Sequence, residues 1–287
     1  MLKKLLVTGL VAAFGLSALT SVTYAQEETV LKVASQVPPM TDIVELAAEA
    51  IEEPYTIELV EVTDNVQYNE AVFNDEAYAS FAQHMPFMEM FNKEKEADLV
   101  AIQPIYNAVV GFYSPVYKSI DDIEEGAEVA IPSDPTNEAR ALLILAHYGL
   151  IELPEDIGLF PTVDDIVENP HQLKFSTLEV GNTPAAYEDG VELVFSYPTY
   201  IAKLDLTPAD ALFLEEDPED RFAIQVVVRE GNKDSEATKA LIKAFNSDKV
   251  RAFVDELSEK GHLKPSFDSN ATEEPADSET TEESAEE

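Results

Sequence analysis

One stretch of the sequence, SDPTNEARALL (133–143), brings together groups that could bind an anion. Asp134 can cap a helix, and Arg140 then falls in or just after the opening turn, where free backbone amides already favour negative charge. Asn137 adds a polar side chain between them. Helix amides and a guanidinium together predict a carboxylate or phosphate site. The alternative is that Arg140 pairs with a nearby acid such as Glu138 or Asp134.

Two further stretches could line a pocket. SFAQHMPFMEMF (80–91) combines phenylalanines and methionines with one histidine, His84. Such residues at near-helical spacing are usually core, but an apolar wall with one polar group is also typical of small-molecule sites. VFSYPTYIA (194–202) places two tyrosines around a proline, which indicates a strand end or a loop facing a cleft.

Catalytic signatures are missing from the sequence. It contains no phosphate-binding loop, no Rossmann glycine pattern, no HExxH and no GxSxG motif. The four histidines are widely spaced, and there is no cysteine, so we expect neither a metal site nor thiol chemistry. Paired carboxylates carry no weight among 57 acidic residues. We therefore expect a protein that is not an enzyme and needs no cofactor.

Charge limits the possible partners. The chain has 57 acidic and 18 basic residues, which gives a formal net charge of −39. A field of this sign repels nucleic-acid phosphates and anionic lipid headgroups. We therefore expect no nucleic-acid partner and no direct binding to a membrane surface.

The two ends of the chain differ from its middle. Residues 1–25 have a basic start, a short apolar run and a small-x-small site before Gln26, which predicts a signal peptide. Because the sequence has no cysteine, we expect an exported protein, periplasmic or secreted, without an N-terminal lipid anchor. Residues 267–287 are acidic and almost devoid of apolar side chains, which predicts a disordered tail.

Strand-like and helix-like segments alternate between these ends, which predicts an α/β fold. Residues 77–95 are expected to pass through a turn into a helix, and 126–150 to form a strand, a loop and a helix ending at Gly149. The other expected strands are 30–37, 55–62, 98–106, 109–115, 173–180, 191–203 and 221–230, and the other expected helices are 41–53, 66–76 and a pair in 235–261 broken near Asn246-Ser247.

Several of these segments resemble one family. DPTNEARALLIL (134–145), FAQHMPFMEMFNKEK (81–95), DIVENPHQLKF (165–175) and VGFYSPVYKSIDDI (110–123) are similar to the NlpA-type substrate-binding proteins, the methionine-binding components of an ABC importer. The resemblance runs from about residue 30 to residue 267. It implies a type II periplasmic-binding-protein fold with two α/β lobes, formed by residues 26–109 with 203–266 and by residues 110–202, and a ligand cleft between them.

The resemblance also implies site residues. Asn137 and Arg140 match a polar clamp, with Arg140 on the ligand carboxylate and the helix amides beside it. The family's Asn-Gly-Asn run corresponds here to Tyr197-Pro198-Thr199, which alters the wall expected to hold the amino group. An aromatic-and-histidine wall and one further pocket position complete the expected set, which consists of Arg140, Asn137, His84, Phe81, Phe87, Tyr68, Tyr197 and Thr199.

The function implied is that of a non-catalytic, monomeric receptor. It would bind L-methionine or a related small amino acid between its lobes and deliver it to an ABC permease with a cytoplasmic ATPase. Two alternatives stay open at this point. One is a paralogue for another carboxylate, such as a Met peptide or another organic acid. The other is a secreted interaction protein that retains the fold without transport.

Overall fold

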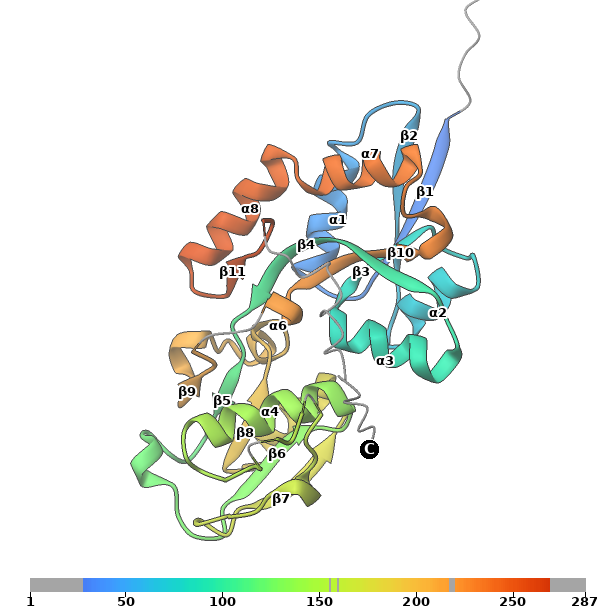
Figure 1. Ribbon diagram of the computed structural model, residues 1–287. Helices are drawn as coiled ribbons and strands as arrows, with labels where there is room; N and C mark the ends of the chain where they lie inside the picture. The colour runs from blue at the N-terminus through green and yellow to red at the C-terminus, as the bar shows by residue number, and fades with distance from the viewer. Residues whose placement is uncertain (1–27, 155, 159, 217–219, 269–287) are drawn as a thin grey trace, which may run out of the picture.

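The chain folds around two β-sheets that lie one beyond the other along the molecule (Figure 1). The computed structural model describes residues 28–154, 156–158, 160–216 and 220–268. The predicted signal peptide, residues 1–25, lies outside these residues, as does the predicted acidic tail beyond Asp268.

The first sheet has six strands: β1 (Thr29–Ser35), β2 (Tyr55–Glu61), β3 (Ala79–His84), β4 (Leu99–Ala108), β10 (Ile224–Arg229) and β11 (Leu263–Pro265). Their spatial order is β11-β4-β10-β3-β1-β2. β1 pairs in parallel with β2 and β3, whereas β10 is antiparallel to both β3 and β4. Five of the six β10 residues are buried, as expected for a central strand that is rich in valine.

The second sheet has five strands: β5 (Gly111–Tyr113), β6 (Glu128–Pro132), β7 (Lys174–Leu178), β8 (Leu193–Ser196) and β9 (Phe213–Leu214). Their order is β7-β6-β8-β5-β9, with β6 parallel to both β7 and β8 and with β5 antiparallel to β8 and β9. The predicted boundary between the lobes, at residues 202/203, assigns β9 to the other lobe, although β9 pairs with β5 of this sheet. The boundary itself stays a prediction.

Helices flank both sheets (Figure 1). α1 contacts α7 and α8. α2 and α3 pack on strands of the first sheet, and their apolar residues form a second buried cluster with residues of those strands. The helices are α1 (Met40–Ala48), α2 (Gln67–Phe73), α3 (Met85–Lys95), α4 (Pro135–His147), α5 (Thr183–Glu188), α6 (Pro198–Ile201), α7 (Glu236–Phe245) and α8 (Asp248–Glu259). Single 3-10 turns are η1 (Ile120–Asp122), η2 (Val163–Asp165), η3 (Val180–Asn182), η4 (Ala202–Leu204), η5 (Pro208–Asp210), η6 (Asp220–Phe222) and η7 (Glu230–Asn232).

Local sequence signals set the helix ends. Asp134 caps α4 by accepting a hydrogen bond from the amide of Asn137 at 2.9 Å, and Gly149 follows the helix with φ of +71°, a conformation that glycine adopts without strain. Ser247 caps α8 and separates it from α7, so the predicted break near Asn246-Ser247 is confirmed.

The main core is continuous between the two sheets. Phe81 of the first sheet and Phe112 of the second belong to one apolar cluster, which passes through Tyr106 and Ala108 of β4. Only Val109 and Val110 separate β4 from β5, so this strand carries the chain directly from one sheet to the other. The return passes through residues 215–223, between β9 and β10.

Two sequence-based element predictions are wrong. Ala79–His84 is the strand β3 rather than part of a turn and helix, because these residues lie between β1 and β10 and complete the sheet. Residues 191–203 do not form one strand, since β8 ends at Ser196 and Pro198 starts α6. Proline suits the first turn of a helix, where its missing N–H leaves no bond unmade.

Gly111 allows a close approach of β5 and β9. A Cβ added at this residue would lie 2.5 Å from the carbonyl oxygen of Phe213, which is backbone and cannot turn aside. We expect Gly111→Ala to lower the free energy of unfolding by about 1–3 kcal/mol, as overpacking does. Urea denaturation measures the loss. Gly231→Ala is the control, since a Cβ there meets nothing within 4 Å, and an equal effect in both variants would contradict the prediction.

Candidate ligand-binding site

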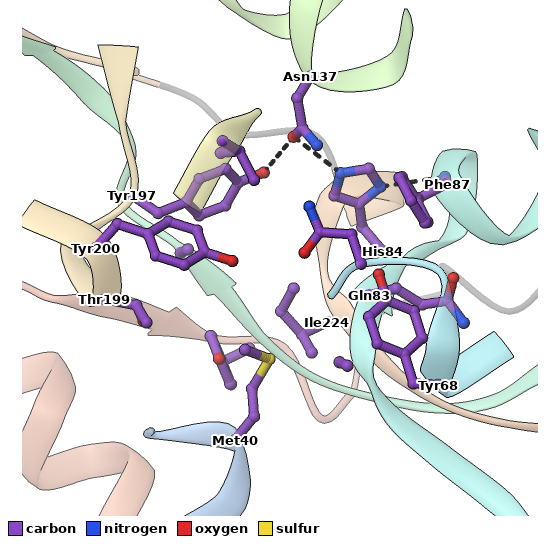
Figure 2. Close-up of a pocket in the computed structure, with 15 residues that line it drawn as sticks. Met40, Tyr68, Gln83, His84, Phe87, Asn137, Tyr197, Thr199, Tyr200 and Ile224 are labelled. Atoms are coloured by element: carbon purple, nitrogen blue, oxygen red, sulfur yellow. Dashed lines mark hydrogen bonds between the residues drawn. The ribbon is translucent and has the colours of Figure 1, made fainter. Parts of the chain in front are cut away.

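A cavity lies between the two sheets and takes its walls from both. Its empty space, counting the part open to solvent, is about 540 Å³. The first sheet and its helices contribute residues of α1, α2, β3, α3, β4 and β10, and the second contributes residues of α4, η3 and α6. Figure 2 labels ten of the lining residues: Met40, Tyr68, Gln83, His84, Phe87, Asn137, Tyr197, Thr199, Tyr200 and Ile224.

His84 occupies the junction of β3 and α3. Its backbone is extended, and its Nδ1 accepts a hydrogen bond from the amide of Phe87 at 3.3 Å, which caps α3. Nε2 therefore carries the proton and donates to Oδ1 of Asn137 at 3.2 Å. Burial, together with the nearby Arg140 guanidinium, lowers the pKa of His84 to about 4. The imidazole is neutral at physiological pH, with a fixed orientation.

Asn137 connects the walls of the two lobes. Its Oδ1 accepts from Tyr197 Oη at 2.6 Å and from His84, and these two bonds meet at one oxygen in Figure 2. Its Nδ2 donates to both carboxylate oxygens of Asp134 at 3.0 Å. The same carboxylate receives the Asn137 amide, so the start of α4 already holds an anion from its own chain.

Arg140 lies behind the cavity wall rather than in it. Its side chain is 1% exposed, and it donates from Nε and Nη2 to the carboxylate of Glu215, with 2.9 Å from Nε to Oε1. Nη1 donates to Tyr197 Oη at 3.2 Å and Nη2 to the carbonyl of Ala108 at 3.3 Å. Phe222 covers the guanidinium, with Cζ 4.5 Å from the ring centroid. The positive charge is therefore paired within the protein.

Tyr197 connects this ion pair to the cavity lining by hydrogen bonds. Its hydroxyl accepts from Arg140 and donates to Asn137. Burial raises the pKa of Tyr197 to about 12, although the Arg140 guanidinium acts in the opposite direction. The phenol is thus neutral, and a chain of hydrogen bonds runs from Glu215 to His84.

The cavity surface is polar in places but uncharged. None of the fifteen residues drawn around it in Figure 2 is Asp, Glu, Lys or Arg. The hydroxyls of Tyr68, Tyr106 and Tyr200 form no hydrogen bond with the described residues and lie in the lining. Such a surface offers hydrogen bonds and apolar contact but no counter-charge for a ligand.

The structure brings six of the eight expected site residues to this cavity, but leaves two outside its lining. Arg140 is one of the two, and the clamp expected between it and a ligand carboxylate is occupied by Glu215. The six in the lining are Tyr68, His84, Phe87, Asn137, Tyr197 and Thr199.

Phe81 is the second expected residue outside the lining. It is fully buried in the main core, with its ring centroid 5.2 Å from that of Phe245 and 6.2 Å from that of Tyr106. Ala82, the next residue of β3, lines the cavity instead. Successive side chains of a strand point to opposite faces, so Ala82 faces the cavity while Phe81, which the family resemblance implied for the wall, faces the core.

Other lining residues were not expected. Tyr200 lies on α6 directly after the expected Thr199, and its position beside expected residues in the sequence could have identified it as a lining residue. Gln83 precedes His84, and its amide pairs with that of Asn69 on α2, with 2.7 Å from Asn69 Nδ2 to Gln83 Oε1. Ile224 enters from β10, more than a hundred residues from β3, and no local pattern marks it.

Comparisons with known proteins agree with this two-sheet architecture. The family model described as NlpA lipoprotein matches residues 31–267, and the chain belongs to this family. It is 36% identical over 238 residues to the D-methionine-binding lipoprotein MetQ of Escherichia coli K12, covering 82% of this chain and 88% of the relative. The resemblance recognised in the sequence and the α/β binding-protein fold that it implied are confirmed.

Two solved structures extend the likeness to three dimensions. A YaeC-family lipoprotein from Enterococcus faecalis V583 is 46% identical with a TM-score of 0.73, and the match covers 84% of this chain and all of that one. A nutrient-binding protein from Burkholderia cenocepacia, solved with bound methionine, is 32% identical with a TM-score of 0.78, covering 83% and 100% of the two chains.

The comparisons contradict the localisation expected from the sequence. The matching family model and the curated relatives are named as lipoproteins, a class that carries an N-terminal lipid anchor. The expectation of an exported protein without such an anchor is therefore corrected. It rested on the lack of cysteine in the 287 residues.

The described residues contain neither a membrane-spanning helix nor a metal-binding cluster. No helix in the described part of the chain has the length and apolar character needed to cross a bilayer. Among residues 28–268, leaving aside the undescribed positions, no three His, Cys, Asp or Glu side chains are grouped to hold a metal ion.

The lowered pKa of His84 predicts a pH dependence of stability. An ordinary histidine pKa is 6.5 and that of His84 is about 4, so the unfolded chain binds more protons between these values. This contribution is fully present above pH 6.5 and is lost as pH falls toward 4, by roughly 3 kcal/mol in all.

Urea denaturation at pH 7.0 and 4.5 checks this value. We expect wild type to lose more stability than His84→Gln between the two pH values, because the variant has no imidazole to protonate. His171→Gln is the control, since His171 is not part of the cavity lining. The prediction fails if His84→Gln and His171→Gln behave alike.

Proposed function

We propose that this chain is a methionine-binding receptor that delivers its ligand to an ABC permease. The relative from Escherichia coli is named for D-methionine binding, and the Burkholderia cenocepacia protein was solved with methionine. The observation that supports the proposal in this chain is the cavity between the two sheets, whose Met40, Phe87 and Ile224 suit an unbranched apolar side chain.

We propose direct ligand contact for the six expected residues in the lining, together with Tyr200. Tyr68 and Phe87, with ring centroids 6.2 Å apart, form an apolar wall on one side. Asn137, held by Asp134, and Thr199 supply polar atoms on the other. Phe81 supports the wall from the core, where it packs against Tyr106.

The proposed role of Arg140 is positioning. Its guanidinium donates four hydrogen bonds, to Glu215, Tyr197 and the Ala108 carbonyl, and its charge is paired with Glu215, so it acts on the ligand through the tyrosine and Asn137. We further propose a non-catalytic monomer without a cofactor, with lobes formed by residues 26–109 with 203–266 and by 110–202. A ligand that touches both walls favours the closed arrangement of such lobes.

Isothermal titration calorimetry tests the proposed function directly. The purified chain is titrated with L-methionine and D-methionine. Leucine, with a branched apolar side chain, and glutamate, with a charged one, are controls of similar size. We expect saturable binding of methionine with one site per chain and weaker binding of both controls. The proposal would be rejected if neither enantiomer of methionine bound.

Asn137→Ala tests the polar contact. Truncation leaves Tyr197 Oη and His84 Nε2 without their shared acceptor, and unmade buried hydrogen bonds cost about 1–3 kcal/mol. We expect methionine affinity to fall roughly tenfold to a hundredfold in the same titration. Asn232→Ala, outside the cavity, should bind as wild type does, and an unchanged Asn137→Ala affinity would remove this residue from the site.

Arg140→Leu and the double variant Arg140→Leu/Glu215→Leu separate stability from binding. The single change leaves a largely buried carboxylate unpaired, so we expect a loss of about 3 kcal/mol, much of which the double variant should recover. If Arg140 acts by positioning, both variants bind methionine and methioninamide more weakly by similar factors. A loss confined to methionine, which alone carries the carboxylate, would show direct contact instead.

A further inference from the structure

A pair of buried amides joins α2 to β3 beside the cavity. Asn69 of α2 is fully buried, and Gln83 of β3 is 2% exposed. Asn69 Nδ2 donates to Gln83 Oε1 at 2.7 Å, and Gln83 Nε2 donates in return to Asn69 Oδ1. Each amide is therefore both donor and acceptor to the other, and this reciprocal pair fixes the distance and the relative orientation of the two side chains.

Both members of the pair are next to aromatic residues of the cavity. Asn69 directly follows Tyr68, and Gln83 directly precedes His84 and belongs to the lining itself (Figure 2). The rings of Tyr68 and His84 lie beside that of Phe87, with centroids 6.2 and 6.3 Å from it. We call Tyr68, His84 and Phe87 the aromatic wall. The amide pair thus links the two chain segments, α2 and the end of β3, that carry Tyr68 and His84.

The position of α2 depends on contacts with the rest of the protein. It has seven residues, and a helix of that length is not stable by itself. Ala71 and Val72 pack in the second buried cluster, but apolar contacts are not directional. Among the described residues, Asn69 provides the buried side-chain hydrogen bonds from α2 to the sheet. The amide pair is therefore the contact that sets how α2, and with it Tyr68, is rotated relative to β3.

A third amide lies across the sheet from the pair. Gln225 of β10 is opposite Gln83 in the strand pairing, and directly opposed residues of antiparallel strands share one face. Gln225 is fully buried, and neither its Oε1 nor its Nε2 bonds to a described residue. If Asn69 is removed, Gln225 offers Gln83 another partner. Asn69 is thus the residue that holds the Gln83 amide against α2.

We infer that Asn69 is a positioning residue that sets ligand selectivity through Gln83 and the aromatic wall. The reciprocal pair fixes the spacing of Tyr68 from His84 and Phe87. A cavity with fixed walls admits an unbranched side chain of the right width and disfavours a branched one, whereas walls that can shift lose this discrimination. The inference rests on the proposed function and deepens it, since it concerns the choice among apolar amino acids.

Asn69→Leu tests this role by its effect on selectivity. The substitution removes both polar atoms of the amide and leaves a buried apolar side chain. Methionine, norleucine and leucine are titrated by calorimetry, with competition against labelled methionine where binding is weak. We expect the two unbranched ligands to bind about threefold to tenfold more weakly, the range for buried hydrogen bonds, and leucine to bind as it does to wild type. Selectivity against leucine then falls by the same factor.

Two further variants control for a general effect on folding. Gln225→Leu removes a buried amide at the opposed position, but one without a partner among the described residues, so it should keep the affinities of wild type. The exchange variant Asn69→Gln/Gln83→Asn keeps a reciprocal pair of the same total length, and it should regain selectivity relative to Asn69→Leu. Circular dichroism checks that each variant is folded, and Asn69→Ala takes the place of Asn69→Leu if the latter is not.

Three results would overturn the inference while the receptor function stands. The first is that Asn69→Leu weakens all three ligands equally or none of them, and the second is that Gln225→Leu changes selectivity as much as Asn69→Leu does. The third is an exchange variant no more selective than Asn69→Leu. If wild type does not bind methionine, the proposed function fails and this inference falls with it.

Discussion

The buried charge of Arg140 is the constraint on which the site depends. A guanidinium with 1% exposure requires a carboxylate, and Glu215 supplies it from the segment that returns from the second sheet to the first. Two further donors bind Tyr197 and the carbonyl of Ala108 at the end of β4, the strand that makes the outward crossing. One side chain on α4 therefore fixes both crossings between the lobes, and any movement of the lobes must preserve or replace this pairing.

The same pairing explains why the cavity can be neutral. Charge is paired one layer behind the wall, and only neutral groups line the cavity there: the phenol of Tyr197, the amide of Asn137 and the imidazole of His84. Their hydrogen bonds are directional and mutually fixed, so the wall is preorganised without a free ion.

Local patterns in the sequence predicted the unit around α4 in detail, because a cap, a first-turn proline and a terminal glycine act within a few residues of one another. Of the two interpretations of Arg140, the one that paired it with an acidic residue agrees with the structure. The partner, however, is Glu215, 75 residues away, rather than Glu138 or Asp134. Phe81 was implied for the wall by the family resemblance, and it lies in the core because alternate residues of the strand β3 face opposite sides. Ile224 could not be found, since only sheet pairing brings β10 beside β3.

The cap of α4 has a consequence for how this protein could diversify. Asp134 receives the backbone amide and the side-chain Nδ2 of Asn137 and the hydroxyl of Thr136, so one carboxylate both starts the helix and orients a site residue. Substitutions there would impair folding and recognition together, and selection has little freedom at that wall. The positions more open to substitution are those on the short helix α6, where Thr199 lines the cavity and its side chain forms no hydrogen bond with the described residues. Changes in ligand preference should therefore arise from substitutions in α6, while α4, which carries Arg140, stays the same.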